Sequence, residues 1–416
     1  KKSFIEQTAN KINVNVSQSP IASTSNAYDI LLQSPGVIEQ NGNLNFRSKS
    51  VTVLVDGKLT NLSGEDLKAM LTSMSGNTID KVEILPNPSS KYDALGGSVI
   101  NIKLLKNRKS GFSGSFIANN QTGKYASFLP GMTFNYKNKA VNIYSSYNYE
   151  NSKQYYKNNS DQVLSAVSQL LQDEDGNVAK NNHNYRIGID YDINKKNTVG
   201  FLFKGVNNDN TLSGNNNINL LNSGGSSLSA LKNDSKSKIF NPAANFYYKT
   251  VLDSLQRTMT INLDYFEYKK DIKENFITKY FTNNASEILL RDFANGNNKV
   301  YSAAVDFEYP SNIGNFEFGL KSTNTKSDND ITWENLLNNQ WINDPSKSNH
   351  FIYKENINAG YASYDKALGD NWQITLGIRG EHTHSDGRLI GGEQNIRNYF
   401  NLFPNVNLQY LKNLNN

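Results

Sequence analysis

Cysteine is absent from the 416 residues of this chain, which excludes disulfide frameworks, thiol catalysis and cysteine-ligated metal sites. Tryptophan and proline are scarce, at 3 and 9 residues. No apolar run approaches the roughly 20 residues of a transmembrane helix, because stretches such as 30–32 and 53–55 stop at once. The chain begins Lys1-Lys2-Ser3-Phe4, without the apolar segment of a signal peptide. We therefore expect an exported form to start after processing or inside a longer precursor.

Charge of one sign is not concentrated either. The 43 basic and 38 acidic residues leave a net charge of +5, and the basic residues are scattered, so no nucleic-acid partner is expected. The 23 tyrosines and 20 phenylalanines suit β-strands and the interfacial girdles of membrane barrels alike. A mean hydropathy of −0.61 does not exclude a barrel, since barrel strands alternate lipid-facing and lumen-facing residues. Composition alone leaves a secreted array of β-sandwiches as the alternative.

The first 108 residues mix helical and strand patterns and carry two strong turn signals, Pro35-Gly36 and Asp56-Gly57. Ser63 is expected to cap a helix, with Asp66 three residues further on. The expected helices are 27–33 and the one that Ser63 caps; the expected strands are 51–55, 79–85 and 98–105. Residues 1–108 therefore predict a compact α/β domain that can bury a core of its own.

From residue 109 onward the chain changes to long alternating strands. In residues 258–265, Met259, Ile261, Leu263 and Tyr265 share one face, and polar residues share the other. The same alternation occupies 185–193, 301–309 and 372–381. The polar faces carry charge in mid-strand, as a watery lumen permits, and this favours an outer-membrane barrel over a soluble sandwich.

The connections between these strands are expected to alternate strictly between short and long. Short links are predicted near 137–139, 194–197, 253–256, 310–314 and 369–370. Long polar loops are predicted at 151–181, 208–236, 270–298, 326–348 and 385–398. Tight turns at one end and long loops at the other are typical of an outer-membrane barrel.

The chain supplies about twelve such strands, and a barrel of that size has no room for a folded domain of about 100 residues. Plugged lumens belong to barrels of about 22 strands. The predicted fold is therefore mainly β: a transmembrane antiparallel β-barrel with a small α/β plug domain in its lumen. Residues 109–416 would form the N-terminal, incomplete portion of that barrel, with about ten strands still to come.

Several segments of the first domain carry a family resemblance. They are Ile79-Asp80-Lys81-Val82-Glu83-Ile84-Leu85, Asn87-Pro88-Ser89-Ser90-Lys91-Tyr92-Asp93-Ala94 and Gly96-Gly97-Ser98-Val99-Ile100-Asn101-Ile102, supported by 31–37, 43–47 and 53–57. In this order they resemble the plug domain of TonB-dependent receptors, of the outer-membrane β-barrel family common in Bacteroidetes. Segments 372–385 and 401–406 resemble the family's barrel more diffusely. The family's TonB box, which precedes the plug, does not occur in this chain, so energy coupling is implied by the resemblance alone.

The residues that match the plug motif are Pro35, Gly36, Arg47, Asp56, Gly57, Glu83, Pro88, Ser89, Tyr92, Gly96, Gly97 and Asn101. Gly96-Gly97 would let the backbone bend where the plug feeds the first barrel strand. The resemblance implies that Arg47 and Glu83 help to hold the plug inside the barrel. The alternative is that both are ordinary solvated charges of a folded domain.

No other constellation predicts chemistry. His382 and His384 share one face of a strand but lack a third metal ligand, so the tail of a polar strand is the better interpretation. Residues 173–177 begin like a calcium loop without its spacing, and are expected to be a solvated loop. No nucleophile elbow, phosphate loop or dinucleotide fingerprint occurs. The chain is interpreted as non-enzymatic, with no cofactor and no metal.

The resemblance implies active import of a scarce solute across the outer membrane of a Gram-negative cell, driven by a TonB-type energy-coupling protein in the periplasm. Its partners would be outer-membrane lipid, the small solute and a surface lipoprotein or other outer-membrane subunit. The alternative is a plugged barrel that acts as a structural subunit of a larger outer-membrane assembly or secretion complex, since a fold can lose transport and keep its architecture. A surface adhesin would be favoured if the strands proved soluble. Nothing in the polar loops specifies the solute.

Overall fold

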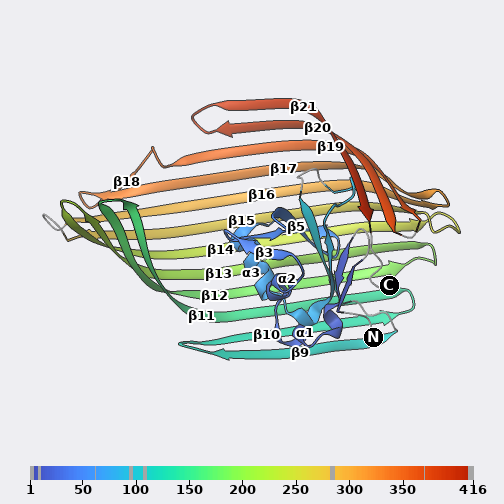
Figure 1. The fold of residues 1–416 in the computed structure, drawn as a ribbon, viewed down its shortest axis with the longest axis horizontal. Helices are drawn as coiled ribbons and strands as arrows, with labels where there is room; N and C mark the ends of the chain where they lie inside the picture. The colour runs from blue at the N-terminus through green and yellow to red at the C-terminus, as the bar shows by residue number, and fades with distance from the viewer. Residues whose placement is uncertain are drawn as a thin grey trace.

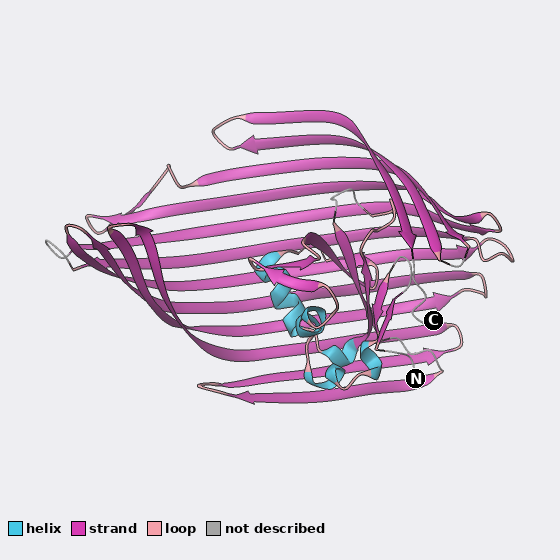
Figure 2. Ribbon diagram, viewed as in Figure 1, coloured by secondary structure: helices cyan, strands magenta, loops and turns pink. Residues whose placement is uncertain are grey.

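The computed structural model describes residues 4–7, 11–60, 62–92, 97–105, 110–281, 286–369 and 371–410. These residues form two sheets (Figures 1 and 2). The smaller sheet and the helices belong to the chain up to residue 105, and we call them the N-terminal unit. The larger sheet, which we call the wall, takes up the rest.

The N-terminal unit has eight strands in the order β1-β2-β7-β8-β5-β4-β3, with β6 paired to β5. Neighbouring strands are antiparallel except for β5 and β8, which are parallel. The strands are β1 (Ile5–Gln7), β2 (Ile12–Val14), β3 (Val37–Gln40), β4 (Asn43–Phe46), β5 (Lys49–Val55), β6 (Lys58–Leu59), β7 (Ile79–Leu85) and β8 (Ser98–Leu104). The helices are η1 (Val16–Gln18), α1 (Ile21–Thr24), α2 (Ala27–Leu32), α3 (Gly64–Ser73) and η2 (Gly76–Thr78).

One hydrophobic core holds the unit together. Leu31 of α2, Leu71 of α3, and Ile84 and Ile100 of the sheet are fully buried in it. Asn26 caps α2 through its side chain, which accepts from the Asp29 amide at 2.9 Å. The expected cap on α3 is wrong in detail, because Ser63 occupies the N-cap position without a side-chain hydrogen bond. The side chain of Asp66 lies outside the described residues.

The wall is a 13-stranded antiparallel sheet in which strands follow one another from β9 to β21, with β18 as a short addition to β17. In the described residues β9 and β21 are the two edges of this curved sheet. The strands are β9 (Gly111–Thr122), β10 (Ala126–Asn138), β11 (Val141–Ser165), β12 (Ser168–Asp192), β13 (Asn197–Asn222), β14 (Gly225–Val251), β15 (Thr258–Tyr280), β16 (Ser286–Ser311), β17 (Gly314–Leu337), β18 (Gln340–Asn343), β19 (Asn349–Leu368), β20 (Trp372–Leu389) and β21 (Gln394–Tyr410).

The prediction of long loops is wrong. Residues 151–181 form the paired far ends of β11 and β12, which stay in register from Asn151↔Asn181 to Gln162↔Leu170. The other predicted loops 208–236, 270–298, 326–348 and 385–398 likewise lie largely in strands. Polar residues predominate in these extensions and their apolar residues do not alternate regularly, so the period-two signal that marks a half-buried strand is missing. The backbone ladder continues without it, and the strands reach 27 residues in β14.

The wall has a polar inner face, which contacts the N-terminal unit, and an outer face with an apolar belt between two aromatic rows. Near the short turns, Phe316 packs on Tyr364 and Trp372 on Tyr410, with ring centroids 4.9 and 5.0 Å apart. The opposite row is formed by Tyr265 and Tyr301, 5.2 Å apart. Exposed apolar side chains fill the belt: Leu263, Phe318, Leu320, Leu376 and Ile378. Such a belt is typical of the lipid-facing surface of an outer-membrane barrel.

If the apolar belt faces lipid, a charged substitution within it should prevent insertion. Leu263→Arg or Leu376→Arg should destabilise the inserted protein by about 2–4 kcal/mol and block assembly, because a cation would face hydrocarbon. Thr260→Arg is the matched control, since Thr260 lies next to Ile261 on the opposite face of β15. Folded protein in the membrane fraction is the measurement. Equal loss on both faces would contradict a lipid-facing belt.

Candidate functional site

The inner face of the wall meets the N-terminal unit, which lies against the curve of the sheet (Figure 1). Side chains of the unit and the wall contact one another around Asp56, around Ser90 and Lys91, and along α3. The first two contacts are polar and the third is mainly apolar.

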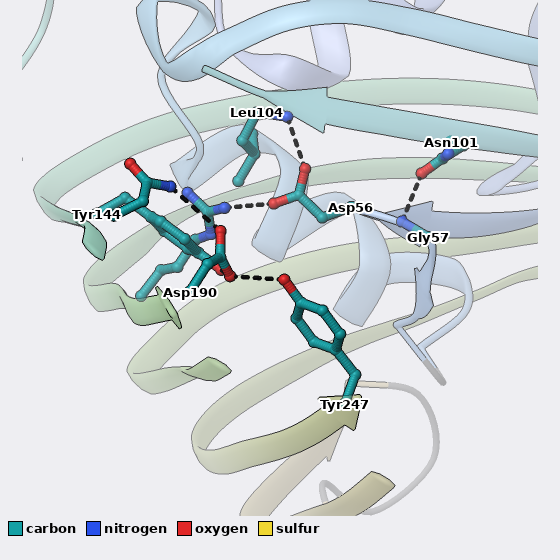
Figure 3. Close-up of polar contacts among 9 residues, drawn as sticks. Asp56, Gly57, Asn101, Leu104, Tyr144, Asp190 and Tyr247 are labelled. Atoms are coloured by element: carbon teal, nitrogen blue, oxygen red, sulfur yellow. Dashed lines mark hydrogen bonds and ion pairs between the residues drawn. The ribbon is translucent and has the colours of Figure 1, made fainter. Parts of the chain in front are cut away.

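The hairpin turn between β5 and β6 carries the first contact. Asp56 and Gly57 have φ angles of 54° and 79°, the left-handed conformations that an Asp-Gly turn adopts readily. The turn directs the Asp56 carboxylate at β12, where it forms an ion pair with Arg186. Its other oxygen accepts from the Leu104 amide at 3.0 Å (Figure 3). The side chains of Asp56 and Arg186 are only 10% and 6% exposed, so neither charge is solvated by bulk water.

Contacts within the wall also hold the Arg186 side chain in place, independently of the N-terminal unit. Its guanidinium lies 4.3 Å from the ring centroid of Tyr144 on β11. The Tyr144 hydroxyl donates to Asp190 at 3.3 Å, and the Tyr247 hydroxyl donates to the same oxygen at 2.9 Å (Figure 3). Asn142 donates to the second Asp190 oxygen at 3.1 Å. These bonds fix the aromatic ring on which the cation rests.

Behind the turn, hydrogen bonds continue into the unit. The Gly57 amide donates to Asn101 Oδ1 at 2.8 Å (Figure 3). Asn101 Nδ2 in turn donates to Glu83 at 3.2 Å. Lys81 and Lys11 approach the Glu83 carboxylate at 2.6 and 3.4 Å. Burial opposes ionisation of Glu83, but the lysines outweigh it, so the pKa of Glu83 is lowered. One polar chain therefore joins Glu83 in the unit to Asp190 in the wall.

The second contact is formed by the loop after β7. Ser90 donates its amide to Ser363 Oγ of β19 at 3.2 Å, and its carbonyl accepts from Arg379 of β20 at 3.5 Å. Gly377 makes room for this approach, because a Cβ there would lie 2.1 Å from Ser90 Oγ. The Pro88 carbonyl accepts from Asn405 of β21 at 3.1 Å. The Arg379 side chain is 2% exposed, so this contact is also shielded from solvent.

Next to Ser90, two further residues face acidic side chains of the wall. Lys91 lies 3.5 Å from Asp306, which also accepts hydrogen bonds from Tyr361 and Asn262. Burial, together with carboxylates that include Glu317, raises the pKa of Tyr92 to about 12, so its phenol stays protonated at neutral pH. The loop thus offers the wall a cation and a neutral hydroxyl group, which match its carboxylates.

The third contact is mainly apolar. Val206 of β13 is 3% exposed and belongs to the hydrophobic core of the N-terminal unit. Together with Phe266 of β15 it borders a cavity of about 40 Å³ whose opposite side is formed by Met70 and Met74. Space of that size holds a water molecule. The wall therefore completes the core of the unit on this side, without close packing throughout.

The structure places the residues of the predicted plug motif at several different points. Asp56, Gly57, Glu83, Pro88, Tyr92 and Asn101 belong to the polar contacts described above, either facing the wall or supporting the Asp56 turn from inside the unit. Ser89 closes the local turn by accepting from the Tyr92 amide at 3.1 Å. Pro35 and Gly36 lie between α2 and β3, with a φ of 77° at Gly36. Gly97 approaches Ser50 so closely that a Cβ would meet its carbonyl oxygen at 2.4 Å. Gly96 lies outside the described residues.

The described contacts of Arg47 and Glu83 lie within the N-terminal unit. Arg47 sits over the ring of Phe46 at 5.1 Å, and the hydrogen bonds of Glu83 stay inside the unit. Among the described residues, direct polar contacts with the wall come from Asp56, Ser90 and Lys91, and also from Asn87, Pro88 and the Met70 carbonyl. The charged wall partners Arg186, Arg379 and Asp306 were not predicted. The available signal was charge on the polar face of alternating strands, which does not say where a distant turn will dock.

The weaker candidates give no site. His382 and His384 both lie on the outer face of β20, and residues 173–177 lie in β12 instead of in a loop. Within the described ranges no three His, Cys, Asp or Glu side chains gather as a metal site requires. No helix in those ranges is long and apolar enough to cross a membrane.

Part of the chain matches a known protein family. Residues 250–416 match the model of the outer membrane protein beta-barrel family. That match covers β15 to β21, which carry much of the apolar belt and the Arg379 contact. The protein resides in the outer membrane. No curated protein matches the sequence.

Solved structures with the same fold extend the likeness over the whole chain. The siderophore receptor PiuA from Acinetobacter baumannii gives a TM-score of 0.56 at 10% identity, over 97% of this chain and 61% of that one. The unliganded ferric citrate transporter FecA gives 0.55 at 15% identity, over 98% and 61%. This chain thus spans less than two thirds of either structure. At such identities the likeness establishes the fold: a large antiparallel β-sheet together with the smaller N-terminal unit.

Proposed function

We propose that this protein imports a scarce solute across the outer membrane, and that residues 1–108 form a plug that closes the lumen of the barrel until it is moved. The observation that carries the proposal is the interface around Asp56 and Ser90. Its contacts are mostly hydrogen bonds and ion pairs, and the wall supplies a matching polar partner at each position.

A polar interface suits a part that must move. When water enters, each donor and acceptor exchanges its protein partner for water at a modest net cost of about 0.5–1.5 kcal/mol. Separating an apolar interface of the same area would cost about 25 cal/mol of free energy for every Å² of apolar surface exposed to water. The apolar contact at Val206 is small and borders a cavity, so it adds limited resistance.

The driving force would come from a TonB-type protein in the periplasm, as in the receptors that the first domain resembles. No step needs a nucleophile, a metal or a cofactor, and we propose a non-catalytic protein. The two solved relatives are a receptor for siderophores and a transporter of ferric citrate. We do not transfer those ligands to this chain, since its inner wall is rich in asparagine, a side chain that specifies no particular solute.

Deletion of residues 1–108 tests the plug directly. The complete protein without this segment should still insert, because the lipid-facing belt lies entirely on the wall, and it should conduct ions and small solutes across a planar bilayer. The intact protein should stay closed under the same conditions. A deletion variant that inserts and remains closed would contradict the proposal, since the wall would then seal itself.

A further inference from the structure

We propose that three outward-facing lysines on adjacent strands of the wall bind the phosphate groups of a lipid in the outer leaflet. We call Lys299 of β16, Lys326 of β17 and Lys354 of β19 the lysine row. The proposal depends on the location of the protein in the outer membrane and does not depend on import.

The three lysines stand side by side. Lys299 pairs in register with Lys326, and Lys326 pairs with Lys354. Strands are spaced about 4.8 Å apart, so neighbouring ammonium groups can reach one phosphate together. Residues at even distances along the same strands belong to the outer face, including the exposed Tyr301 and Leu320. The row therefore points away from the N-terminal unit.

Like charges directly opposite one another destabilise a sheet, so the row needs an anion. Glu267 flanks one end and lies 3.5 Å from Lys299. The nearby carboxylate of Asp328 is engaged by His350 at 2.7 Å, and Asp386 beyond Lys354 accepts from Gln394 at 2.8 Å. Among the described residues, Lys326 and Lys354 have no carboxylate within ion-pair distance. Both are exposed, and together they can hold an external anion.

The position of the row favours a lipid as the source of that anion. Lys299 precedes Tyr301 by two residues on the same face, just beyond the Tyr265–Tyr301 row that bounds the apolar belt. Headgroups of a bilayer lie at such a boundary, where lysines near the surface attract anionic lipids. A lipid seated there could also pack its acyl chains on Leu320, which is 68% exposed. A free phosphate ion would use the lysines and gain nothing from the belt.

The experiment measures binding of diphosphoryl lipid A to the complete, detergent-purified protein by native mass spectrometry. The Lys326→Gln/Lys354→Gln variant should bind at least about tenfold more weakly, since each lysine near a lipid surface contributes about 1 kcal/mol. Lys236→Gln/Lys238→Gln is the matched control. These two lysines lie on another strand and each faces Asp209 at 3.8 Å, so binding should be unchanged. Heat-dependent gel migration checks that every variant is folded.

Two outcomes overturn the proposal. One is unchanged lipid binding in the folded Lys326→Gln/Lys354→Gln variant, or an equal loss in the control variant, which would reduce the effect to overall charge. The other is displacement of lipid A by inorganic phosphate at equal concentration, which would make the row a site for any phosphate.

Discussion

Arg186→Met should loosen the N-terminal unit from the wall by about 3–5 kcal/mol, because it leaves the Asp56 carboxylate buried without its partner. Hydrogen exchange of β5 and β8 in the inserted protein is the measurement, since both strands end at the Asp56 turn. Asp56→Asn should have a similar effect, because it leaves the Arg186 cation buried without its partner, although the Leu104 amide keeps an acceptor. The double variant should recover most of the loss, because no charge is then buried alone.

The control for this pair is Lys68 and Glu39, an ion pair inside the unit with side chains 35% and 30% exposed. Glu39→Gln should change protection by less than about 1 kcal/mol, as is usual for solvated pairs. If Arg186→Met were as mild as Glu39→Gln, the Asp56 turn would not anchor the unit.

The sequence predicts the local parts of this interface well. The Asp56-Gly57 turn follows from a dipeptide that tolerates left-handed conformations, and the structure has it at the end of β5. Alternation in 185–193 places Ile187 and Ile189 on the exposed face and Arg186 on the other, as observed. Helix and strand positions in the first 108 residues agree to within a few residues at most ends. In each case the deciding interaction is between close neighbours in the chain.

What could not be predicted depends on distant pairing. Asp56 and Arg186 are 130 residues apart, and Ser90 and Arg379 are 289 apart. Their meeting requires the register of every strand between them, which no local pattern gives. The strand extensions in 151–181 were missed for a related reason. Apolar residues do not recur at every second position in this segment. Only the backbone hydrogen bonds between β11 and β12 identify it as a pair of strands.

The central claim is that uptake requires the N-terminal unit to move away from the wall, and a reversible crosslink tests it most directly. Ser90 and Gly377 suit this purpose, since a Cβ on Gly377 would lie 3.3 Å from the Ser90 Cβ, close to the 3.5–4.5 Å of a disulfide. The chain has no cysteine of its own. Ser115→Cys/Thr133→Cys joins two strands within the wall and is the matched control.

Uptake of the solute into cells that carry the oxidised Ser90→Cys/Gly377→Cys protein is the measurement, compared before and after reduction. We predict that uptake is abolished when the disulfide is closed and returns when it is reduced. Solute binding should persist in both states. The control crosslink should change neither uptake nor binding. Full uptake through the locked protein would contradict the central claim. A complete protein that shows no uptake in either state would instead support the role of a structural subunit.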